Sequence, residues 1–401
     1  MYLLRGASEV VTPRPAVKPH FGDAMGFVDR RANTDILIEG DKIIKVAKHI
    51  EAPGAEVIDV AGKVVVPGFV DPHTHLVWAG SREHELEWKL KGKSYQEILA
   101  DGGGILRTVR ETRAVDESEL REQTLKRFKK AVQFGTTTIE IKSGYGLDED
   151  TELKQLRVAN WLKSLNLADT VVTFMGAHAF PDGLSKVEYV SEVIRILPLV
   201  KDLAEYCDVF CEEGAFTVDE SKEILTAAKS LGFKLKIHAD EFGDTGGGRL
   251  GAELGVTTAD HLAGSSLETI KELSNSGVIG VLLPGTPFAL LSDHYSPARK
   301  MIANNLPIAL ATDCNPNCYT ESMQLVQQLA VFRMGMTPAE ALVSSTINAA
   351  FAIGKKDRGA ISEGWRADLL ICDVPDYRHL TYHFGINHVD TVIIGGKIID
   401  G

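Results

Sequence analysis

Two histidines at the end of an apolar run are the first residues of this sequence that could do chemistry. His73 and His75 follow the segment VVVPGFVD (residues 64–71), which is rich in β-branched residues and predicts a buried strand. Side chains two residues apart on a strand project to the same face, about 6.5 Å apart at roughly 3.3 Å per residue. Two imidazoles at that spacing can both reach one metal ion, at about 2.1 Å for zinc. We therefore interpret the pair as part of a metal site.

Other imidazoles and carboxylates end further strand-like runs. Five of the twelve histidines lie at such ends. The residues that we expect to share a site with the first pair are His178, His238, Glu241, His261 and Asp313. His238 and Asp313 would complete three nitrogen ligands and one oxygen ligand, with a position left for water. Such an open set fits Zn²⁺ and also Fe²⁺.

Eight strand-like runs in the middle of the chain alternate with amphipathic segments. The runs cover residues 64–71, 136–144, 170–178, 207–213, 234–240, 256–262, 277–284 and 307–313. Helices are expected between them, for example over 116–135 and 185–206, with Asp116 and Ser185 as N-caps. Eight strand–helix units in about 250 residues match an α/β fold of the (β/α)8 TIM-like barrel type. The carboxyl ends of barrel strands share one face, so the residues above would meet there.

An open, doubly wound sheet is the alternative architecture. Such a sheet usually carries a glycine-rich phosphate loop after its first strand, and none follows residues 64–71. The glycine-rich segment DGGGILR (101–107) follows a polar, helix-like stretch, and we interpret it as a loop. The pattern therefore favours the barrel.

Both ends of the chain are β-rich. Residues 1–63 and 359–401 contain short apolar runs separated by turn residues, such as Glu39-Gly40-Asp41. We predict a small β-sandwich domain built from both termini, packed beside a barrel domain over residues 64–358.

Bulk properties limit the partners. The chain has 401 residues, 44% of them hydrophobic and 24% charged, which is an ordinary globular composition. A net charge of -12 argues against a nucleic-acid partner. The five cysteines lack the pairing of a secreted scaffold, and neither a signal-peptide pattern nor an apolar run of about 18 residues is present. We expect a cytoplasmic protein with a small-molecule partner and no membrane partner.

The first strand and its histidines also resemble a known family. VVVPGFVDPHTH resembles the metal-binding opening of the amidohydrolase superfamily, and STINAAFAIGKKDRGAISEGWRADLLICD resembles its closing segment. The segments IEIKSGYGL, FMGAHAFP, KIHADEF, ADHL and ATDCNPNC match, in order, one branch of that superfamily. That branch hydrolyses the cyclic amide C–N bond of 4-imidazolone-5-propanoate to N-formimidoyl-L-glutamate in histidine degradation. The resemblance implies a metal-dependent hydrolase with this activity.

The resemblance also implies a role for each site residue. It implies one divalent metal per chain, zinc or iron, held by His73, His75, His238 and Asp313. It implies a substrate-binding set of Arg82, Tyr145, His178, Glu241, Asn315, Asn317 and Cys318, and a catalytic set of Glu241, His261 and Asp313. An arginine fork could bind the carboxylate of the substrate through two parallel hydrogen bonds. A homodimer is implied as well.

Three details of the site stay open at this point. The family usually has glycine and then a small hydroxyl residue where this chain has Asn317 and Cys318, which puts a ligand contact through that hydroxyl in doubt. Either Asp313 or Glu241 could be the general base. Asp71 is expected to orient a ligand imidazole rather than to bind the metal.

Three other functions match parts of the pattern. A purine or pyrimidine deaminase on the same barrel also uses paired histidines and a histidine followed three residues later by glutamate. A two-metal hydrolase of cyclic imides or ureides normally needs a lysine on the fourth strand, and CDVFCEEGAF (207–216) has none, although Glu212 or Glu213 could bridge. A non-catalytic binding protein is the third, and the intact ligand set disfavours it.

Overall fold

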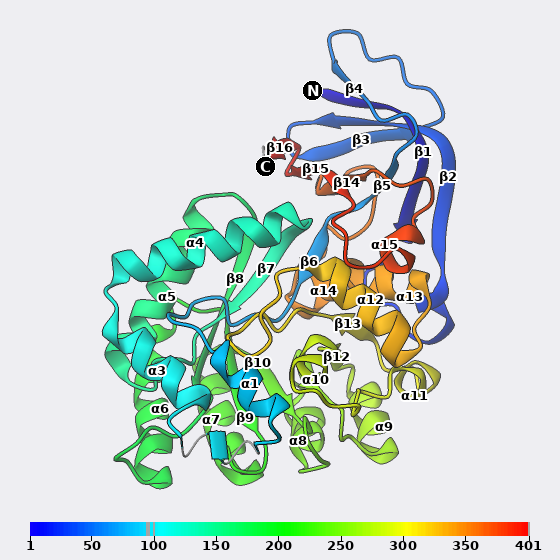
Figure 1. Cartoon of the computed structure of the whole chain (residues 1–401). Helices are drawn as coiled ribbons and strands as arrows, with labels where there is room; N and C mark the ends of the chain where they lie inside the picture. Colours follow the sequence, from blue (N-terminus) through cyan, green and yellow to red (C-terminus); the bar gives the residue numbers. More distant parts are fainter. Residues whose placement is uncertain (94–96, 99–100, 400–401) are drawn as a thin grey trace.

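A computed structural model describes residues 1–93, 97–98 and 101–399 of the chain. Figure 1 shows a barrel surrounded by helices, with a smaller β region beside one end of it. The amino and carboxyl termini both lie at this smaller region. The predicted metal ligands lie on the barrel, and both chain ends belong to the β region.

Eight parallel strands form the barrel in chain order. They are β6 (Phe69–Asp71), β7 (Thr136–Lys142), β8 (Asp169–Ala177), β9 (Tyr206–Cys211), β10 (Lys234–Ala239), β11 (Thr258–His261), β12 (Ile279–Leu282) and β13 (Ile308–Leu310). The first and last strands meet just beyond their carboxyl ends, where Asp313 N–H donates to the His73 carbonyl at 3.1 Å and His75 N–H donates to the Cys314 carbonyl at 3.0 Å. The predicted barrel is confirmed. The junction between its first and last strands lies next to three of the predicted metal ligands, His73, His75 and Asp313.

Helices surround the barrel and lie across its ends (Figure 1). They are α1 (His84–Leu90), α3 (Gly104–Ala114), α4 (Glu117–Gln133), α5 (Glu149–Ser164), α6 (Lys186–Val200), α7 (Val218–Ser230), α8 (Gly247–Leu254), α9 (Leu267–Ser276), α10 (Gly285–Ala289), α11 (Ala298–Ala303), α12 (Met323–Met334), α13 (Pro338–Ser344) and α14 (Ile347–Ala352). Asp116 and Ser185 accept the backbone N–H of Glu119 and Glu188, so both predicted N-caps are confirmed. Side-chain caps of this kind satisfy N–H groups that have no partner within the helix.

The loop predicted over residues 101–107 is wrong in its second half. α3 begins at Gly104, and the Glu85 carboxylate accepts the Gly104 N–H at 2.7 Å. A carboxylate at a helix N-terminus stabilises the first turn. This partner lies 19 residues earlier in the chain, so the local pattern of glycines did not predict it.

The smaller β region is one hydrogen-bonded sheet of eight strands. They are β1 (Tyr2–Pro13), β2 (Val28–Glu39), β3 (Lys42–Ala47), β4 (Glu56–Asp59), β5 (Val64–Pro67), β14 (Leu369–Cys372), β15 (Val389–Ile394) and β16 (Lys397–Ile399). β5 joins the two chain ends, because it pairs in parallel with β1 and antiparallel with β14. The short helices η1 (Gly22–Gly26) and α15 (His379–Tyr382) lie between its strands in the sequence. The prediction that both chain ends build one small β region is confirmed, and its strands form a single sheet.

The apolar run over residues 64–71 forms two strands rather than the single barrel strand that was predicted. Its first half is β5 of the terminal sheet, and its second half is β6 of the barrel. Gly68 lies between them, and a Cβ atom there would be 2.3 Å from Thr137 Oγ1. Glycine therefore allows the chain to pass close to β7 as it changes sheets. The division into a barrel domain over 64–358 and a domain of the two ends stays a prediction.

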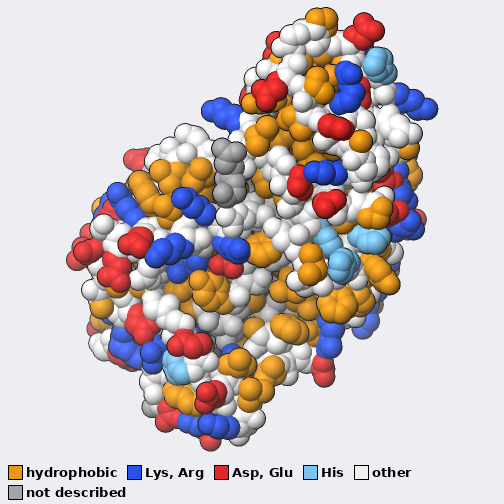
Figure 2. Space-filling model, turned by 45° about the horizontal axis from the view of Figure 1, so that its top comes forward, with side chains coloured by type: hydrophobic (Ala, Val, Ile, Leu, Met, Phe, Trp, Pro, Cys, Tyr) orange, Lys and Arg blue, Asp and Glu red, His pale blue; other side chains and the backbone are white. Residues whose placement is uncertain are grey.

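Charged side chains of both signs are interspersed over the face seen in Figure 2. The net charge of -12 is therefore not gathered into one acidic patch on this face. Within the described ranges, no helix has both the length and the apolar character needed to cross a bilayer.

Candidate metal centre

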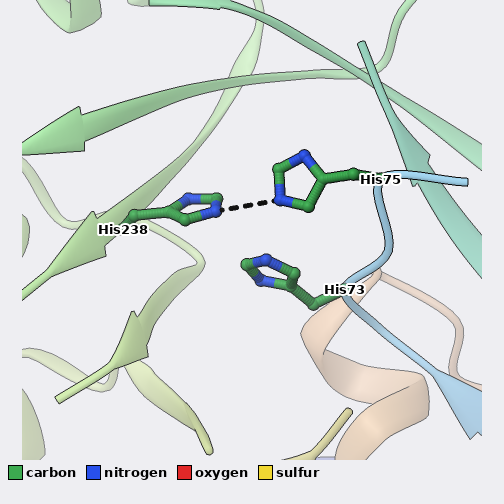
Figure 3. Close-up of side chains that lie close together, drawn as sticks. All are labelled: His73, His75 and His238. Atoms are coloured by element: carbon green, nitrogen blue, oxygen red, sulfur yellow. Dashed lines mark hydrogen bonds between the residues drawn. The ribbon is translucent and has the colours of Figure 1, made fainter. Parts of the chain in front are cut away.

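Three histidine rings converge at the carboxyl end of the barrel (Figure 3). His73 and His75 follow β6, and His238 lies on β10. One possible ligand atom of each lies within 4.8 Å of the others, and the Nε2 atoms of His75 and His238 are 3.3 Å apart. All three residues are buried. The structure thus brings together three of the four predicted ligands, although His238 lies 163 residues after His75 in the sequence.

Asp313 is the fourth member of this group. Its Oδ1 lies 3.6 Å from His73 Nε2 and 3.7 Å from His75 Nε2. Its Oδ2 accepts a hydrogen bond from Thr286 Oγ1 at 2.5 Å. Asp313 has a φ of 52°, a conformation that few residues other than glycine adopt and that concentrates at functional sites. A carboxylate oxygen therefore lies next to two of the three histidine nitrogens.

This group fits a divalent metal ion. The Nδ1 atom of His73 is hydrogen-bonded to Asp260, and its buried Nε2 has no hydrogen-bond partner among the described residues. Burial lowers the pKa of His73 and of His75 well below the ordinary value, and neighbouring positive groups lower it further. The imidazoles are therefore neutral, which is the form that binds metal. A metal ion would use the nitrogen lone pair that otherwise has no partner.

Two aspartates orient the imidazoles from inside the barrel. Asp260 Oδ2 lies 2.6 Å from His73 Nδ1, and Asp208 Oδ1 lies 3.1 Å from His238 Nδ1. A carboxylate on one ring nitrogen fixes the tautomer that presents the other nitrogen to a metal. The same role was predicted for Asp71, and that prediction is wrong. The Asp71 carboxylate instead accepts the N–H and the hydroxyl of Thr312, at 3.1 and 2.6 Å.

A second group of possible ligands, Asp208, His238 and Asp260, also lies close together. The ammonium group of Lys142 already lies among these side chains, 2.7 Å from Asp208 Oδ2 and 3.7 Å from Asp260 Oδ2. A lysine ammonium and a metal cation would compete for the same carboxylates. This group is therefore an ion-pair network rather than a second metal site.

Glu212 and Glu213 do not form a metal bridge in the described structure. Glu212 accepts the backbone N–H groups of Glu213, Glu241 and Phe242 at 2.8 to 3.1 Å. The side chain of Glu213 is exposed. Glu212 instead holds the loop that carries Glu241, a function that the sequence pattern did not indicate.

Glu241 and His261 lie on the side of the centre next to β11. Glu241 Oε2 is 3.7 Å from His261 Nε2, and the His261 ring centroid is 5.2 Å from that of His238. Burial raises the pKa of Glu241 well above its ordinary value, and the negative charges of Asp313 and Glu212 raise it further. Both residues line a cavity whose other walls include Thr286. A carboxyl group and an imidazole therefore lie next to each other at this cavity.

His178 and Tyr145 lie on another side of the centre. The His178 ring stacks on the His75 ring at a centroid distance of 4.7 Å, and the Tyr145 ring is 5.2 Å from His178. His178 Nδ1 donates to the Gly144 carbonyl at 3.1 Å. Burial lowers the pKa of His178 to about 3. A neutral ring with a donor at Nδ1 leaves Nε2 as a hydrogen-bond acceptor.

Arg82 lies in the loop before α1, with its guanidinium bound to a neighbour. Its Nε and NH2 groups donate to the Glu85 carboxylate at 2.9 and 2.7 Å. This bidentate pair uses two of the five guanidinium N–H donors. Among the residues that the structure describes, none accepts the other three N–H groups, and Glu85 holds the guanidinium in place.

The three residues predicted on the loop after β13 mainly shape that loop. Asn315 donates to the Asp313 carbonyl and accepts the N–H groups of Asn317 and Cys318. Asn317 Oδ1 accepts from Lys89 Nζ at 2.5 Å. The Cys318 thiol is buried and donates to the Thr312 carbonyl at 3.5 Å. A contact of these residues with substrate stays a prediction.

Known proteins resemble the chain over nearly its full length. The profile of the amidohydrolase family matches residues 64–399. An imidazolonepropionase of Fusobacterium nucleatum is 48% identical, over 99% of this chain and 98% of its own. An imidazolonepropionase of Caldanaerobacter subterraneus is 47% identical, over 98% of this chain and 96% of its own.

Solved structures share the fold. A 5-methylcytosine deaminase from Klebsiella pneumoniae has a TM-score of 0.73 at 17% identity, covering 98% of this chain and 97% of its own. At that identity the likeness concerns the fold alone, whereas the identities near one half concern the family. The chain belongs to the amidohydrolase family and, within it, groups with the imidazolonepropionases.

Proposed function

We propose that this chain hydrolyses the cyclic amide C–N bond of 4-imidazolone-5-propanoate to give N-formimidoyl-L-glutamate. The observation that carries the proposal is the identity of 47–48%, over nearly the whole chain, to relatives named imidazolonepropionase. The grouping of His73, His75 and His238, with Asp313 Oδ1 3.6 and 3.7 Å from the first two, supports it. The substrate would be a small molecule with a carboxylate.

One divalent ion, zinc or iron, would be held by these four side chains. When bound, such an ion polarises a carbonyl oxygen and lowers the pKa of a water molecule from 15.7 to about 7. The neutral imidazoles of His73 and His75 support a cationic ligand because they add no positive charge to the site. Three nitrogens and one oxygen suit zinc and iron alike.

Asp313 and Glu241 would move the proton that the reaction transfers. Water attacks the ring carbonyl carbon, the C–N bond breaks, and the proton of the water must reach the ring nitrogen that leaves. Either Asp313 or Glu241 would take it as the general base. Glu241 would pass it to the nitrogen, with His261 beside it at 3.7 Å. General acid–base catalysis of this kind contributes about 10²–10⁴-fold.

Arg82, Tyr145 and His178 would bind the substrate. The remaining guanidinium N–H groups of Arg82 would hold the propanoate, with Glu85 keeping the fork in place. His178 would accept a ring N–H at Nε2, because its Nδ1 donates to Gly144. Tyr145 would hydrogen-bond the same ring from the loop that Gln155 holds at its N–H. The loop of Asn315, Asn317 and Cys318 would contribute backbone groups.

The state of the protein in the cell is part of the proposal. We propose that the protein is cytoplasmic, because its five cysteines are free and buried. We propose that it is a homodimer on the basis of the family resemblance. Reduced thiols are typical of cytosolic proteins. Light scattering of the purified protein tests the dimer, since a monomer mass would contradict it.

The reaction is tested by following the ultraviolet absorbance of 4-imidazolone-5-propanoate. We expect the absorbance to fall on addition of the purified protein and N-formimidoyl-L-glutamate to accumulate. The His238→Ala variant is the matched control and should leave the absorbance unchanged. Ammonia release from cytosine, adenine and guanine is measured in parallel. Ammonia from a nucleobase without loss of imidazolone absorbance would replace the proposal with a deaminase.

A further inference from the structure

Five charged side chains lie inside the barrel, beneath the candidate metal centre. They are two lysines and three carboxylates, all with no solvent exposure: Glu140, Lys142, Asp208, Lys236 and Asp260. Removing a charge from water is costly, and a buried ion pair is often no more stable than apolar side chains of the same volume. Stability alone therefore does not explain five buried charges in one layer.

Lys142 connects this layer to the metal ligands. Its Nζ lies 2.7 Å from Asp208 Oδ2 and 3.7 Å from Asp260 Oδ2. The other oxygen of Asp208 lies 3.1 Å from His238 Nδ1, and the same Oδ2 of Asp260 lies 2.6 Å from His73 Nδ1. One ammonium group thus contacts the two carboxylates that orient two different ligand imidazoles.

We propose that Lys142 is the positioning residue that aligns His73 and His238 together and so sets the affinity of the site for its metal ion. The proposal rests on the metal site of the proposed function and adds a residue to it. Asp208 and Asp260 lie on β9 and β11, the two neighbours of the strand that carries His238. The ammonium group lies between these two carboxylates, 2.7 Å from Asp208 Oδ2 and 3.7 Å from Asp260 Oδ2, and so holds both in place. Each carboxylate then accepts one Nδ1–H and presents Nε2 to the metal.

Lys236 provides a matched comparison inside the same layer. It is as completely buried as Lys142, and its Nζ lies 3.1 Å from Glu140 Oε1 and 2.9 Å from the Pro72 carbonyl. Among the described ion pairs, none joins Lys236 to Asp208 or Asp260. Replacing either lysine leaves a buried carboxylate with one cation fewer, but only Lys142 touches the carboxylates on the histidines.

The test measures metal affinity of the metal-free protein, without any substrate. Zn²⁺ is titrated into wild type, Lys142→Met and Lys236→Met in competition with a chromogenic chelator. We expect Lys142→Met to bind Zn²⁺ about 10-fold more weakly than wild type, the lower end of the range for losing a direct partner of a metal ligand, because Lys142 acts through two such partners. Lys236→Met should change the affinity much less, because its Nζ contacts Glu140 and the Pro72 carbonyl rather than the carboxylates on the histidines. The visible absorption of the Co²⁺-loaded forms should shift for the first variant and stay unchanged for the second.

Equal affinities for wild type and Lys142→Met would overturn the proposal, and so would equal losses in both lysine variants, which would indicate a general structural effect. If Lys142→Met does not fold, Asp208→Asn and Asp260→Asn replace it, because they keep the shape of the side chain. Each should weaken Zn²⁺ binding by about 10-fold or more, and unchanged affinity in both would contradict the proposal. A wild-type protein that binds no metal would instead refute the metal site of the proposed function.

Discussion

The two eight-stranded sheets of this protein bury different kinds of side chain. The core of the terminal sheet is formed by aliphatic residues, among them Leu4, Val10, Ile36, Ile38 and Ile393, and all are buried. The inside of the barrel holds buried lysines and carboxylates next to its apolar residues. The terminal sheet buries two carboxylates, Glu9 and Asp35, each beside a partly exposed arginine. The charged groups inside the barrel, by contrast, are completely buried, and such groups are costly to take out of water.

We relate the apolar core of the terminal sheet to stability and the buried charges of the barrel to function. Burying an aliphatic side chain contributes about 1.5–3 kcal/mol to folding, so the terminal sheet can be stable by packing alone. A buried ion pair contributes little to stability unless it is well satisfied. The charged layer of the barrel lies directly beneath the histidines, as the contacts of Asp208 and Asp260 indicate. We therefore expect substitutions in the barrel to affect metal and turnover, and substitutions in the terminal sheet to affect stability.

The largest effect is expected at the metal ligands. His238→Ala removes one of three imidazoles, so the ion should be lost and turnover should fall by about 10⁴-fold or more, since nothing else lowers the pKa of the attacking water. Metal analysis and the absorbance assay measure the two losses. If His238→Ala kept full metal content and full turnover, the reaction would take place at another site.

Glu241 is expected to have the next largest effect. Glu241→Gln keeps the size of the side chain but removes its proton-transfer ability, so kcat should fall by about 10²–10⁴-fold while metal content stays at the wild-type level. Steady-state kinetics together with metal analysis check both parts. Unchanged kcat would exclude a catalytic role for this carboxyl group.

Arg82 should affect substrate binding rather than chemistry. Arg82→Lys keeps the charge but loses the fork, and the loss of a charge-assisted hydrogen bond costs about 2 kcal/mol, roughly 30-fold in KM. The metal content should not change. The measurement is KM and kcat over a range of substrate concentrations. A fall in kcat with an unchanged KM would mean that Arg82 does not hold the propanoate.

The smallest effect is expected in the terminal sheet. Ile36→Val removes one methylene from a fully buried position of β2 and should lower the free energy of unfolding by about 1 kcal/mol. Neither metal content nor kcat should change, because the site lies in the other sheet. Urea denaturation measures the first quantity and the absorbance assay the last. A large loss of kcat in Ile36→Val would contradict the expectation that the terminal sheet affects stability and not turnover.

The sequence predicted the barrel and the residues that the barrel brings together at its carboxyl end, because both depend on local patterns. Strand-like runs and the residues at their ends can be read directly from the chain, as for His73, His75, His238 and Asp313. The terminal sheet was predicted as well, but its strand β5 was assigned to the barrel. An apolar run does not specify which sheet it joins, and only the close approach at Gly68 separates the two strands.

The partners of the ligands were not predicted, because they depend on which residues of different strands lie at the same level of the barrel. Asp208 and Asp260 contact histidines 30 and 187 residues away. One local signal was available. Glu140 and Lys142 lie two residues apart on β7, as Lys236 and His238 do on β10, so each pair faces the same side of its strand. Charges at alternate positions of a buried strand indicate a polar layer inside the barrel.

Metal content of the purified wild-type protein is the most direct test of the central claim that His73, His75, His238 and Asp313 form one metal centre. Elemental analysis gives the identity of the ion and the number of ions per chain. The account predicts about one divalent ion per chain, zinc or iron, bound to this open set of three nitrogens and one oxygen. Two ions per chain would contradict the interpretation of the layer around Lys142 as an ion-pair network. Absence of any bound ion after reconstitution with zinc or iron would contradict the metal centre itself.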